Sequence, residues 1–312
     1  MRISEESKGV YVIAATPFKD DGALDLASTD SMVDFYLDCG VEGMTILGVM
    51  GEAPKLTAEE SVTFLSRVLD RVAGRAGVIV GVSNPGLDNL ARLAHKAMEK
   101  GAGGVMVAPL AGLNTEVKVL GYYEQVCKAL GPDVPLVYQD YPQITGVPVS
   151  VQTLNTLIDR HPQLVMLKHE ESPGLAKITA LRQSAEREGR RHVSILVGNG
   201  GLHYPQELAR GVDGAMTGFA FPEMLVEVYK LHAAGSRDAA EDLFDAYLPL
   251  VRHEQQPGIG LALRKEVLKR RGAIASAKLR APGPSLTAED QAELTRMIER
   301  VERRLSALRL AA

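Results

Sequence analysis

Cysteine is scarce in this sequence, and the two residues present, Cys39 and Cys127, stand far apart in a chain of 312. This scarcity argues against a disulfide framework and a cysteine-rich metal site, and it fits the reducing cytoplasm. No apolar run approaches the roughly 20 residues that a transmembrane helix requires. The first nine residues carry charges and no apolar segment, so we expect no secretory signal.

A strong charge of either sign is also missing. The formal net charge is −4, which gives no reason to expect binding to nucleic acid or to a membrane surface. The composition, 46% hydrophobic and 24% charged, is instead that of an ordinary globular core. The sequence has no low-complexity tract and no long linker. We therefore expect a cytoplasmic protein whose partner is a small molecule.

Short apolar runs alternate with amphipathic segments over most of the chain. Eight of these runs predict strands, and the segments between them predict helices. The expected strands cover 10–15, 44–48, 78–82, 104–108, 134–139, 164–168, 193–197 and 215–218. Eight such units favour a parallel sheet closed into a (β/α)8 TIM barrel, which typically takes about 250 residues.

The pattern changes to helices alone after Phe221. The expected helices cover 222–234, 238–255, 258–271 and 287–309. We assign residues 1–234 to the barrel. Residues 235–312 then form the last barrel helix region and a C-terminal helical extension, which is not an independent domain.

Lys168 follows four apolar residues, Leu164 to Leu167, whose length and bulk are typical of a strand buried on both faces. In a parallel barrel the segments after each strand gather at one end, here called the mouth, where active sites lie. An amine held there with little water loses proton affinity and can form a Schiff base with a carbonyl substrate. The alternative is a lysine that extends to the surface and pairs with Glu170 or Glu171.

Other segments at the expected mouth offer weaker signals. The loop over 48–52 could direct backbone N–H groups at a substrate carboxylate, or it could be only a tight turn. The glycines over 198–201 lack the spacing of a phosphate-binding motif. His169, Glu170 and Glu171 cluster, but adjacent strand residues point in different directions, so we expect no metal site. For the same reason, His169 is expected to face away from Lys168.

Several segments, in the right order, resemble the dihydrodipicolinate synthase and N-acetylneuraminate lyase family of class I aldolases. They are Ala15-Thr-Pro-Phe18, Leu47-Gly-Val-Met-Gly-Glu52, Lys168 with the acidic residues after it, and Leu279-Arg-Ala-Pro-Gly-Pro284. The resemblance implies a barrel with additional C-terminal helices, assembled as a homotetramer or homodimer. It also implies a 2-oxo acid such as pyruvate bound as an imine to Lys168, with no other cofactor.

The sequence departs from the family pattern in two loops. Val49 and Met50 occupy the two threonine positions of a Gly-Thr-Thr-Gly-Glu motif, so a hydroxyl relay cannot run there. After the fifth strand, Gln139 stands at the family's tyrosine position and Ile144 at its arginine position. Tyr141 or Tyr138 would have to supply the missing phenol. An apolar Ile144 argues against an aspartate-semialdehyde partner, whose carboxylate would lack a charge partner.

These observations predict a Schiff-base-forming lyase, either an aldolase or a dehydratase, that acts on pyruvate or a 2-oxo-3-deoxy sugar acid. The expected catalytic residues are Lys168, Tyr141 and Tyr138, and the expected substrate-binding residues are Val49, Met50, Gly51, Gln139, Asp140 and Thr217. The alternatives are dihydrodipicolinate synthase proper, a non-catalytic 2-oxo acid binding protein and a metal-dependent aldolase. Little positive charge besides Lys168 is expected at the mouth, which disfavours a highly phosphorylated substrate.

Overall fold

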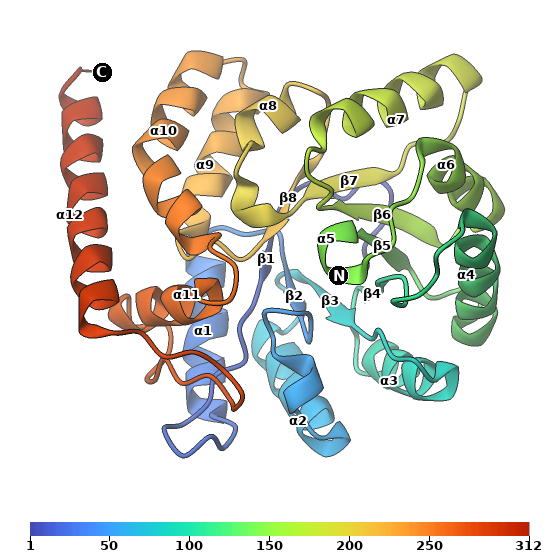
Figure 1. Cartoon of the computed structure of the whole chain (residues 1–312), viewed down its shortest axis with the longest axis horizontal. Coiled ribbons are helices and arrows are strands. Elements are labelled where there is room, and N and C mark those ends of the chain that lie inside the picture. The colour runs from blue at the N-terminus through green and yellow to red at the C-terminus, as the bar shows by residue number, and fades with distance from the viewer. Residues whose placement is uncertain (312) are drawn as a thin grey trace.

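Eight parallel strands form a closed barrel in chain order, and β8 pairs with β1 to complete it (Figure 1). The computed structural model describes residues 1–311, with side chains up to residue 308. The strands are β1 Gly9–Ile13, β2 Gly43–Ile46, β3 Gly77–Gly81, β4 Gly104–Val107, β5 Leu136–Asp140, β6 Leu164–His169, β7 Ser194–Val197 and β8 Gly214–Thr217. The predicted (β/α)8 barrel is confirmed, and every expected strand is present.

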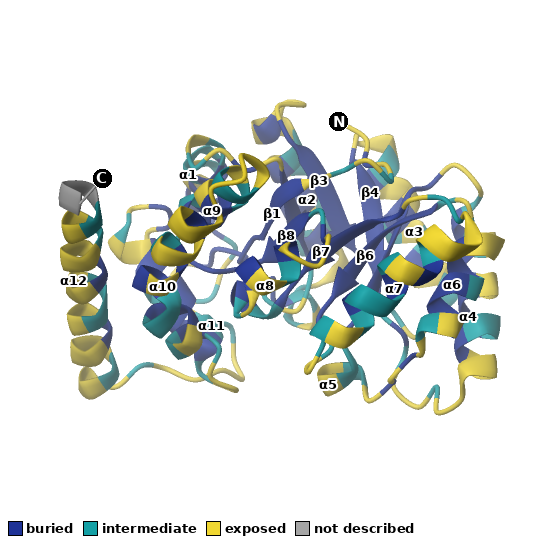
Figure 2. Cartoon of the chain, turned by 90° about the horizontal axis from the view of Figure 1, so that it is seen from above, coloured by how far each residue is buried: buried dark blue, intermediate teal, exposed yellow. Residues whose placement is uncertain are grey.

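Helices surround the barrel and shield the strands from solvent, as the buried strands and the exposed outer helix faces in Figure 2 show. They are α1 Leu26–Asp38, α2 Ala58–Val72, α3 Leu87–Glu99, α4 Glu116–Leu130, α6 Val151–Arg160, α7 Leu175–Glu188, α8 Tyr204–Leu208 and α9 Pro222–Ala233. Three single-turn helices lie in loops, namely η1 Ala53–Lys55, α5 Pro142–Thr145 and η2 Asn199–Gly201. A capping box of Thr57 and Glu60 begins α2.

Three further helices follow the barrel: α10 Arg237–Glu254, α11 Gly260–Arg270 and α12 Ala288–Ala311. α10 packs against α9, and both α11 and α12 pack against α10, so α12 lies at the edge of the molecule (Figure 1). The segment after α11 returns to the barrel, where the Ser31 hydroxyl of α1 donates to the Ala273 carbonyl over 3.0 Å. No helix within the described residues is long and apolar enough to cross a membrane.

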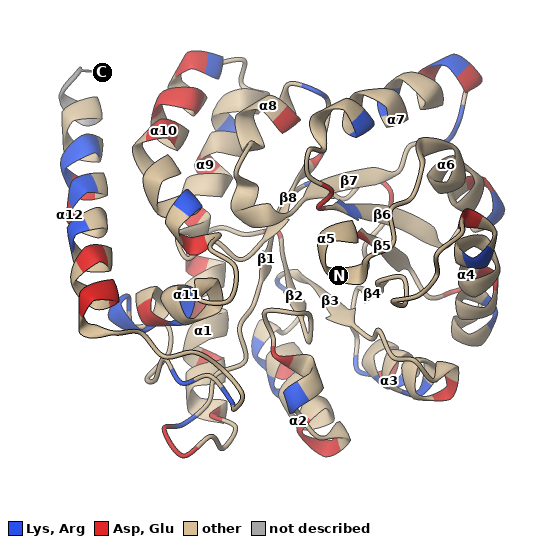
Figure 3. Ribbon diagram, viewed as in Figure 1, with Lys and Arg blue, Asp and Glu red and all other residues tan. Residues whose placement is uncertain are grey.

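The twofold alternation of strand side chains divides the core into two parts. One part fills the barrel and contains Val137 of β5 and Met166 of β6. The other lies between the strands and the helices and contains Tyr138 and Leu167, the next residues of the same two strands. If the alternation continues, Gln139 and Lys168 point into the barrel, whereas Asp140 and His169 point toward the helices. Charged residues lie mainly on the helices, and the strands are largely uncharged (Figure 3).

Candidate active site

Lys168 and Gln139 lie side by side at the mouth of the barrel, because β5 and β6 pair in that register. The Lys168 amine is 3.0 Å from Glu170 Oε2, and the Gln139 side-chain amide donates to the same oxygen over 2.8 Å. The exposed fractions of Lys168 and Glu170 are only 5% and 6%. The alternative interpretation was a lysine that extends to the surface and pairs with Glu170 or Glu171. Lys168 does pair with Glu170, but the pair is enclosed within the protein.

Glu170 is fixed by its backbone and by the loop after β7. Its N–H donates to the Asp140 carbonyl over 2.8 Å, and its own carbonyl accepts from the Asn199 side chain over 2.8 Å. A Cβ atom on Gly198 would overlap the Glu170 side chain, so glycine is required there for the two loops to approach. The glycine-rich segment therefore positions a carboxylate next to Lys168. The sequence indicated Glu170 only as a surface partner of Lys168 or as a member of a metal-binding cluster.

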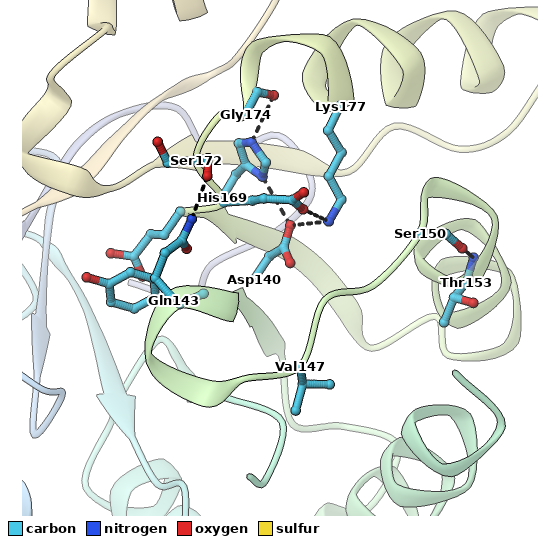
Figure 4. A network of polar contacts seen from close by, with 12 residues as sticks. Asp140, Gln143, Val147, Ser150, Thr153, His169, Ser172, Gly174 and Lys177 are labelled. Carbon is cyan, nitrogen blue, oxygen red and sulfur yellow. Dashed lines mark hydrogen bonds and ion pairs between the residues drawn. The ribbon is translucent and has the colours of Figure 1, made fainter. Parts of the chain in front are cut away.

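A second polar network lies on the opposite, outward face of the same strands (Figure 4). Asp140 Oδ2 is 3.1 Å from His169 Nδ1 and 2.8 Å from the Lys177 amine of α7. His169 Nε2 is 3.2 Å from the Gly174 carbonyl, and Lys177 also pairs with Glu171. His169 faces away from Lys168, as the alternation predicts. Asp140, expected at the substrate, belongs to this outward network and is not brought to Lys168.

The two candidate tyrosines occupy different environments. Tyr138 points outward, its ring centroid is 4.8 Å from that of Tyr123, and its buried hydroxyl has no partner among the described residues. Burial raises the pKa of Tyr138 well above its usual value. Tyr141 is half-buried just after β5. Burial and the charge of Glu170 raise the pKa of Tyr141, whereas Arg264 lowers it. Of the two tyrosines, Tyr141 is the one whose pKa is affected by both Glu170 and Arg264.

The loop after β2 is both a tight turn and a source of donors. The Gly51 N–H donates to the Gly48 carbonyl over 3.0 Å, and the Thr16 hydroxyl donates to the Gly51 carbonyl over 2.6 Å. The N–H and carbonyl groups of Gly51 are therefore both hydrogen-bonded within the protein. Within the described part of the chain, the N–H groups of Val49 and Met50 have no acceptor. The Val49 side chain is 57% exposed, whereas that of Met50 packs against the apolar interior of the barrel.

Glu52 serves the structure of this loop. Its Oε1 accepts from Lys265 of α11 over 2.7 Å, and its Oε2 accepts from Lys55 over 2.8 Å. The Arg280 N–H donates to the same Oε2 over 3.0 Å. Glu52 makes no side-chain cap to the following turn. The loop after β2 is consequently attached to the C-terminal extension.

Two further expectations concern Thr217 and the charge at the mouth. Thr217 is buried in β8, two residues after Ala215 of the outer core, and the alternation turns its side chain away from the barrel interior. The structure does not bring it to Lys168. Positive charge at the mouth was underestimated, because Arg264 of α11 reaches Met50 Sδ with its Nη1 at 3.2 Å. Among the described residues, no group of three or more His, Cys, Asp or Glu side chains could hold a metal ion.

A parallel eight-stranded barrel with a buried lysine and carboxylate at its mouth is the architecture of a TIM-barrel enzyme. The chain belongs to the dihydrodipicolinate synthetase family, whose model matches residues 6–301.

Relatives of the chain carry two kinds of name. It is 30% identical to L-2-keto-3-deoxyarabonate dehydratase of Azospirillum brasilense, over 95% of this chain and 94% of that protein. It is 28% identical to 4-hydroxy-tetrahydrodipicolinate synthase of Methanosphaerula palustris, over 93% and 98%. A crystal structure of dihydrodipicolinate synthase from Rhodopseudomonas palustris superposes with a TM-score of 0.94 at 47% identity, over 96% and 99%. Together they support an enzyme of the aldolase or dehydratase type.

Proposed function

We propose that this protein is a Schiff-base-forming lyase in which Lys168 is the nucleophile and a 2-oxo acid is the substrate. The observation that carries the proposal is the enclosed Lys168 amine on the interior face of the barrel, 3.0 Å from Glu170. An amine in this position can reach a carbonyl carbon held at the mouth. The adjacent carboxylate supplies a place for the proton that the amine must lose before it attacks.

Imine formation requires two proton movements, and Glu170 is positioned for both. Glu170 takes a proton from the Lys168 ammonium, and the free amine forms a bond to C2 of the 2-oxo acid. The carbonyl oxygen takes a second proton from the added amine and becomes a hydroxyl group, which leaves as water when Glu170 returns the first proton. Gln139 holds the same Glu170 oxygen over 2.8 Å and orients it. The product of this step is an iminium linking C2 to Lys168.

The iminium then serves as an electron sink. Removal of a proton from C3 gives an enamine, and the enamine expels the C4 hydroxyl, which leaves as water after accepting a proton. Hydrolysis of the resulting imine releases a 2-oxo acid product and regenerates the lysine. Tyr141, near Glu170, is the candidate for these proton transfers. Aldol cleavage would use the same iminium to break the C3–C4 bond.

The substrate carboxylate is assigned to the loop after β2. The N–H groups of Val49 and Met50 have no acceptor within the described residues, and two adjacent donors suit an anion. The dehydratase relative favours a 2-oxo-3-deoxy sugar acid as substrate. The condensation reaction of a synthase is less well supported, because Ile144, which stands at the family's arginine position in the loop after β5, is 55% exposed and offers no charge to the carboxylate of a separate second substrate.

Borohydride trapping with pyruvate tests the proposal. We expect a reduced pyruvyl adduct on Lys168 in peptide maps, and none on Lys177, the half-buried lysine of the outward network. Lys168→Arg keeps the positive charge beside Glu170 but cannot form the imine, so it should yield no adduct while remaining folded. Absence of an adduct with pyruvate and longer 2-oxo acids would overturn the lyase. An adduct that never turns over would identify a binding protein instead.

A further inference from the structure

Arg264 belongs to the C-terminal extension, yet its side chain ends at the mouth of the barrel. The residue is 9% exposed, and its Nη1 lies 3.2 Å from Met50 Sδ. Met50 packs against the barrel interior, and a Cβ atom on Gly218, just after β8, would overlap its sulfur. The guanidinium therefore lies above the ends of β2 and β8, within the ring of loops that surrounds Lys168.

Neighbouring polar groups hold two sides of the guanidinium in place. Its Nε donates to Glu254 Oε2 over 3.3 Å, and the same oxygen accepts from the Ala220 N–H over 3.3 Å. With the Gln255 amide oriented so that its oxygen faces donors, that oxygen accepts from Arg264 Nη2 and from the Gly200 N–H, the latter over 2.9 Å. Arg264 is thus attached to the loops after β7 and β8.

The third side of the guanidinium is poorly satisfied. Its Nη1 faces a thioether sulfur, which is only a weak hydrogen-bond acceptor. A buried guanidinium normally directs its donors at carboxylate or phosphate oxygens, often two at a time. The charges of Glu170 and Arg264 both act on the pKa of Tyr141, so this phenol lies near both groups. An oxygen of a bound substrate could therefore replace the sulfur as the partner of Nη1.

We propose that Arg264 recognises a second carboxylate, at the far end of a 2-oxo acid whose C2 is bound to Lys168. This inference rests on the proposed function and specifies its substrate class as 2-oxo acids with a second, terminal carboxylate, which the 2-keto-3-deoxyarabonate named for the dehydratase relative lacks. The loop after β5 supplies no cation for such a group, since Ile144 occupies it with an exposed side chain. The extension supplies the cation from a segment that lies far from that loop in sequence.

A carboxylate fits Arg264 better than a hydroxyl group does. The guanidinium is permanently charged, and its buried partner Glu254 does not fully balance it at neutral pH, because burial raises the pKa of Glu254 to about 7. One oxygen of Glu254 also lacks any partner among the described residues. A ligand carboxylate would supply the missing negative charge next to Arg264. A neutral hydroxyl group would leave the positive charge of the guanidinium unbalanced.

Ligands that differ only at the far end test the proposal. The probes are 2-oxoglutarate, with a terminal carboxylate, 5-hydroxy-2-oxopentanoate, with a hydroxyl, and 2-oxopentanoate, with a methyl group. Pyruvate serves as the short reference. Half-saturation is measured by borohydride trapping, and binding is measured independently by calorimetry. The intact protein should bind 2-oxoglutarate about 10- to 100-fold more tightly than 2-oxopentanoate, as expected for one charged hydrogen-bonded pair.

Two variants separate recognition from folding. Arg264→Met removes the charge at similar length and should abolish the preference for 2-oxoglutarate, while trapping of pyruvate, which has no far end, changes by less than about threefold. Arg264→Met alone leaves the buried Glu254 carboxylate without its guanidinium partner. The double variant Arg264→Met with Glu254→Gln removes that carboxylate and should show the same loss of preference as Arg264→Met. Arg210→Met is the matched control, because Arg210 is exposed and bonds Thr179 outside the barrel. It should retain the preference.

Each outcome decides the proposal. A preference for 2-oxoglutarate that survives Arg264→Met, or no preference in the intact protein, would overturn it. Tightest binding of 5-hydroxy-2-oxopentanoate would replace it with recognition of a polyhydroxy acid. Failure to trap pyruvate would instead count against the imine at Lys168. In that case calorimetry with 2-oxoglutarate would still show whether Arg264 binds the second carboxylate.

Discussion

The two faces of the β5–β6 strand pair carry nearly the same chemistry in opposite directions. On the interior face, Lys168 lies 3.0 Å from Glu170, and on the outward face Lys177 lies 2.8 Å from Asp140. Lys168, Glu170 and Asp140 are buried, and the Lys177 side chain is 9% exposed. The first pair is at the open mouth of the barrel, whereas the second pair is closed off beneath α7 and shares its carboxylate with His169. A buried lysine–carboxylate pair is therefore not by itself an active site, and the side of the strand on which it lies decides its role.

The largest expected effect comes from breaking the interior pair. Glu170→Gln keeps the shape of the side chain but removes its capacity to accept a proton from Lys168. We expect the rate of imine formation with pyruvate to fall by about 10²- to 10⁴-fold, the usual contribution of a general base. The measurement is a borohydride-quenched time course. Glu171→Gln, which changes a carboxylate paired with Lys177, is the matched control, and equal slowing in both variants would contradict the assignment.

Breaking the outward pair should affect stability instead of chemistry. Asp140→Ala leaves the buried His169 and the half-buried Lys177 without their shared carboxylate, which costs about 3 kcal/mol of unfolding free energy. Urea denaturation measures this loss, and the folded variant should form the imine at close to the normal rate. Asp140→Asn retains an acceptor and should lose less. Slow imine formation with unchanged stability would reverse the roles of the two faces.

Glu207 extends the comparison to a carboxylate that has no cationic partner among the described residues. Glu207 on α8 has a buried Oε2 with no partner among the described residues, and burial raises the pKa of Glu207 to about 8. The folded protein therefore keeps a proton that the unfolded chain loses above its ordinary pKa of about 4.3. Stability should fall as pH rises between these values.

Glu207→Gln should remove this pH dependence and stabilise the protein by about 1–3 kcal/mol above pH 8, with little effect near pH 5. Urea denaturation at several pH values measures the difference. Glu186→Gln, at an exposed position of α7, should leave the pH dependence unchanged. An unaltered slope in Glu207→Gln would show that this carboxyl group is ionised in the folded protein.

Local pattern was enough to predict the barrel and the central lysine. Short apolar runs separated by amphipathic segments predicted the eight strands, and the position of Lys168 at a strand end placed it at the mouth. The alternation of side chains along a strand predicted that His169 faces away. It also separates Tyr138 from the interior, but the choice between Tyr138 and Tyr141 required the register of β5, which sequence alone left open.

Groups that reach the site across the fold could not be predicted in this way. Arg264 lies on a helix that follows the barrel, and nothing in its local sequence indicates that α11 directs it over Met50. Glu170 follows β6, but its enclosure depends on Gly198 and Asn199 of another loop. The short helix α5 was also missed, because four residues are too few for a periodic pattern. Long-range packing determined the positions of Arg264 and Glu170.

The attachment of Glu52 to Lys265 and Arg280 has a consequence for protein engineering. Loops of TIM barrels are commonly regarded as interchangeable parts, because the scaffold beneath them is independent of their sequence. Here the loop after β2 and the extension form one transferable unit. A graft that moved the loop alone would keep Lys55 but leave the buried Oε1 of Glu52 without its partner Lys265. New specificity should therefore be introduced by exchanging both segments together.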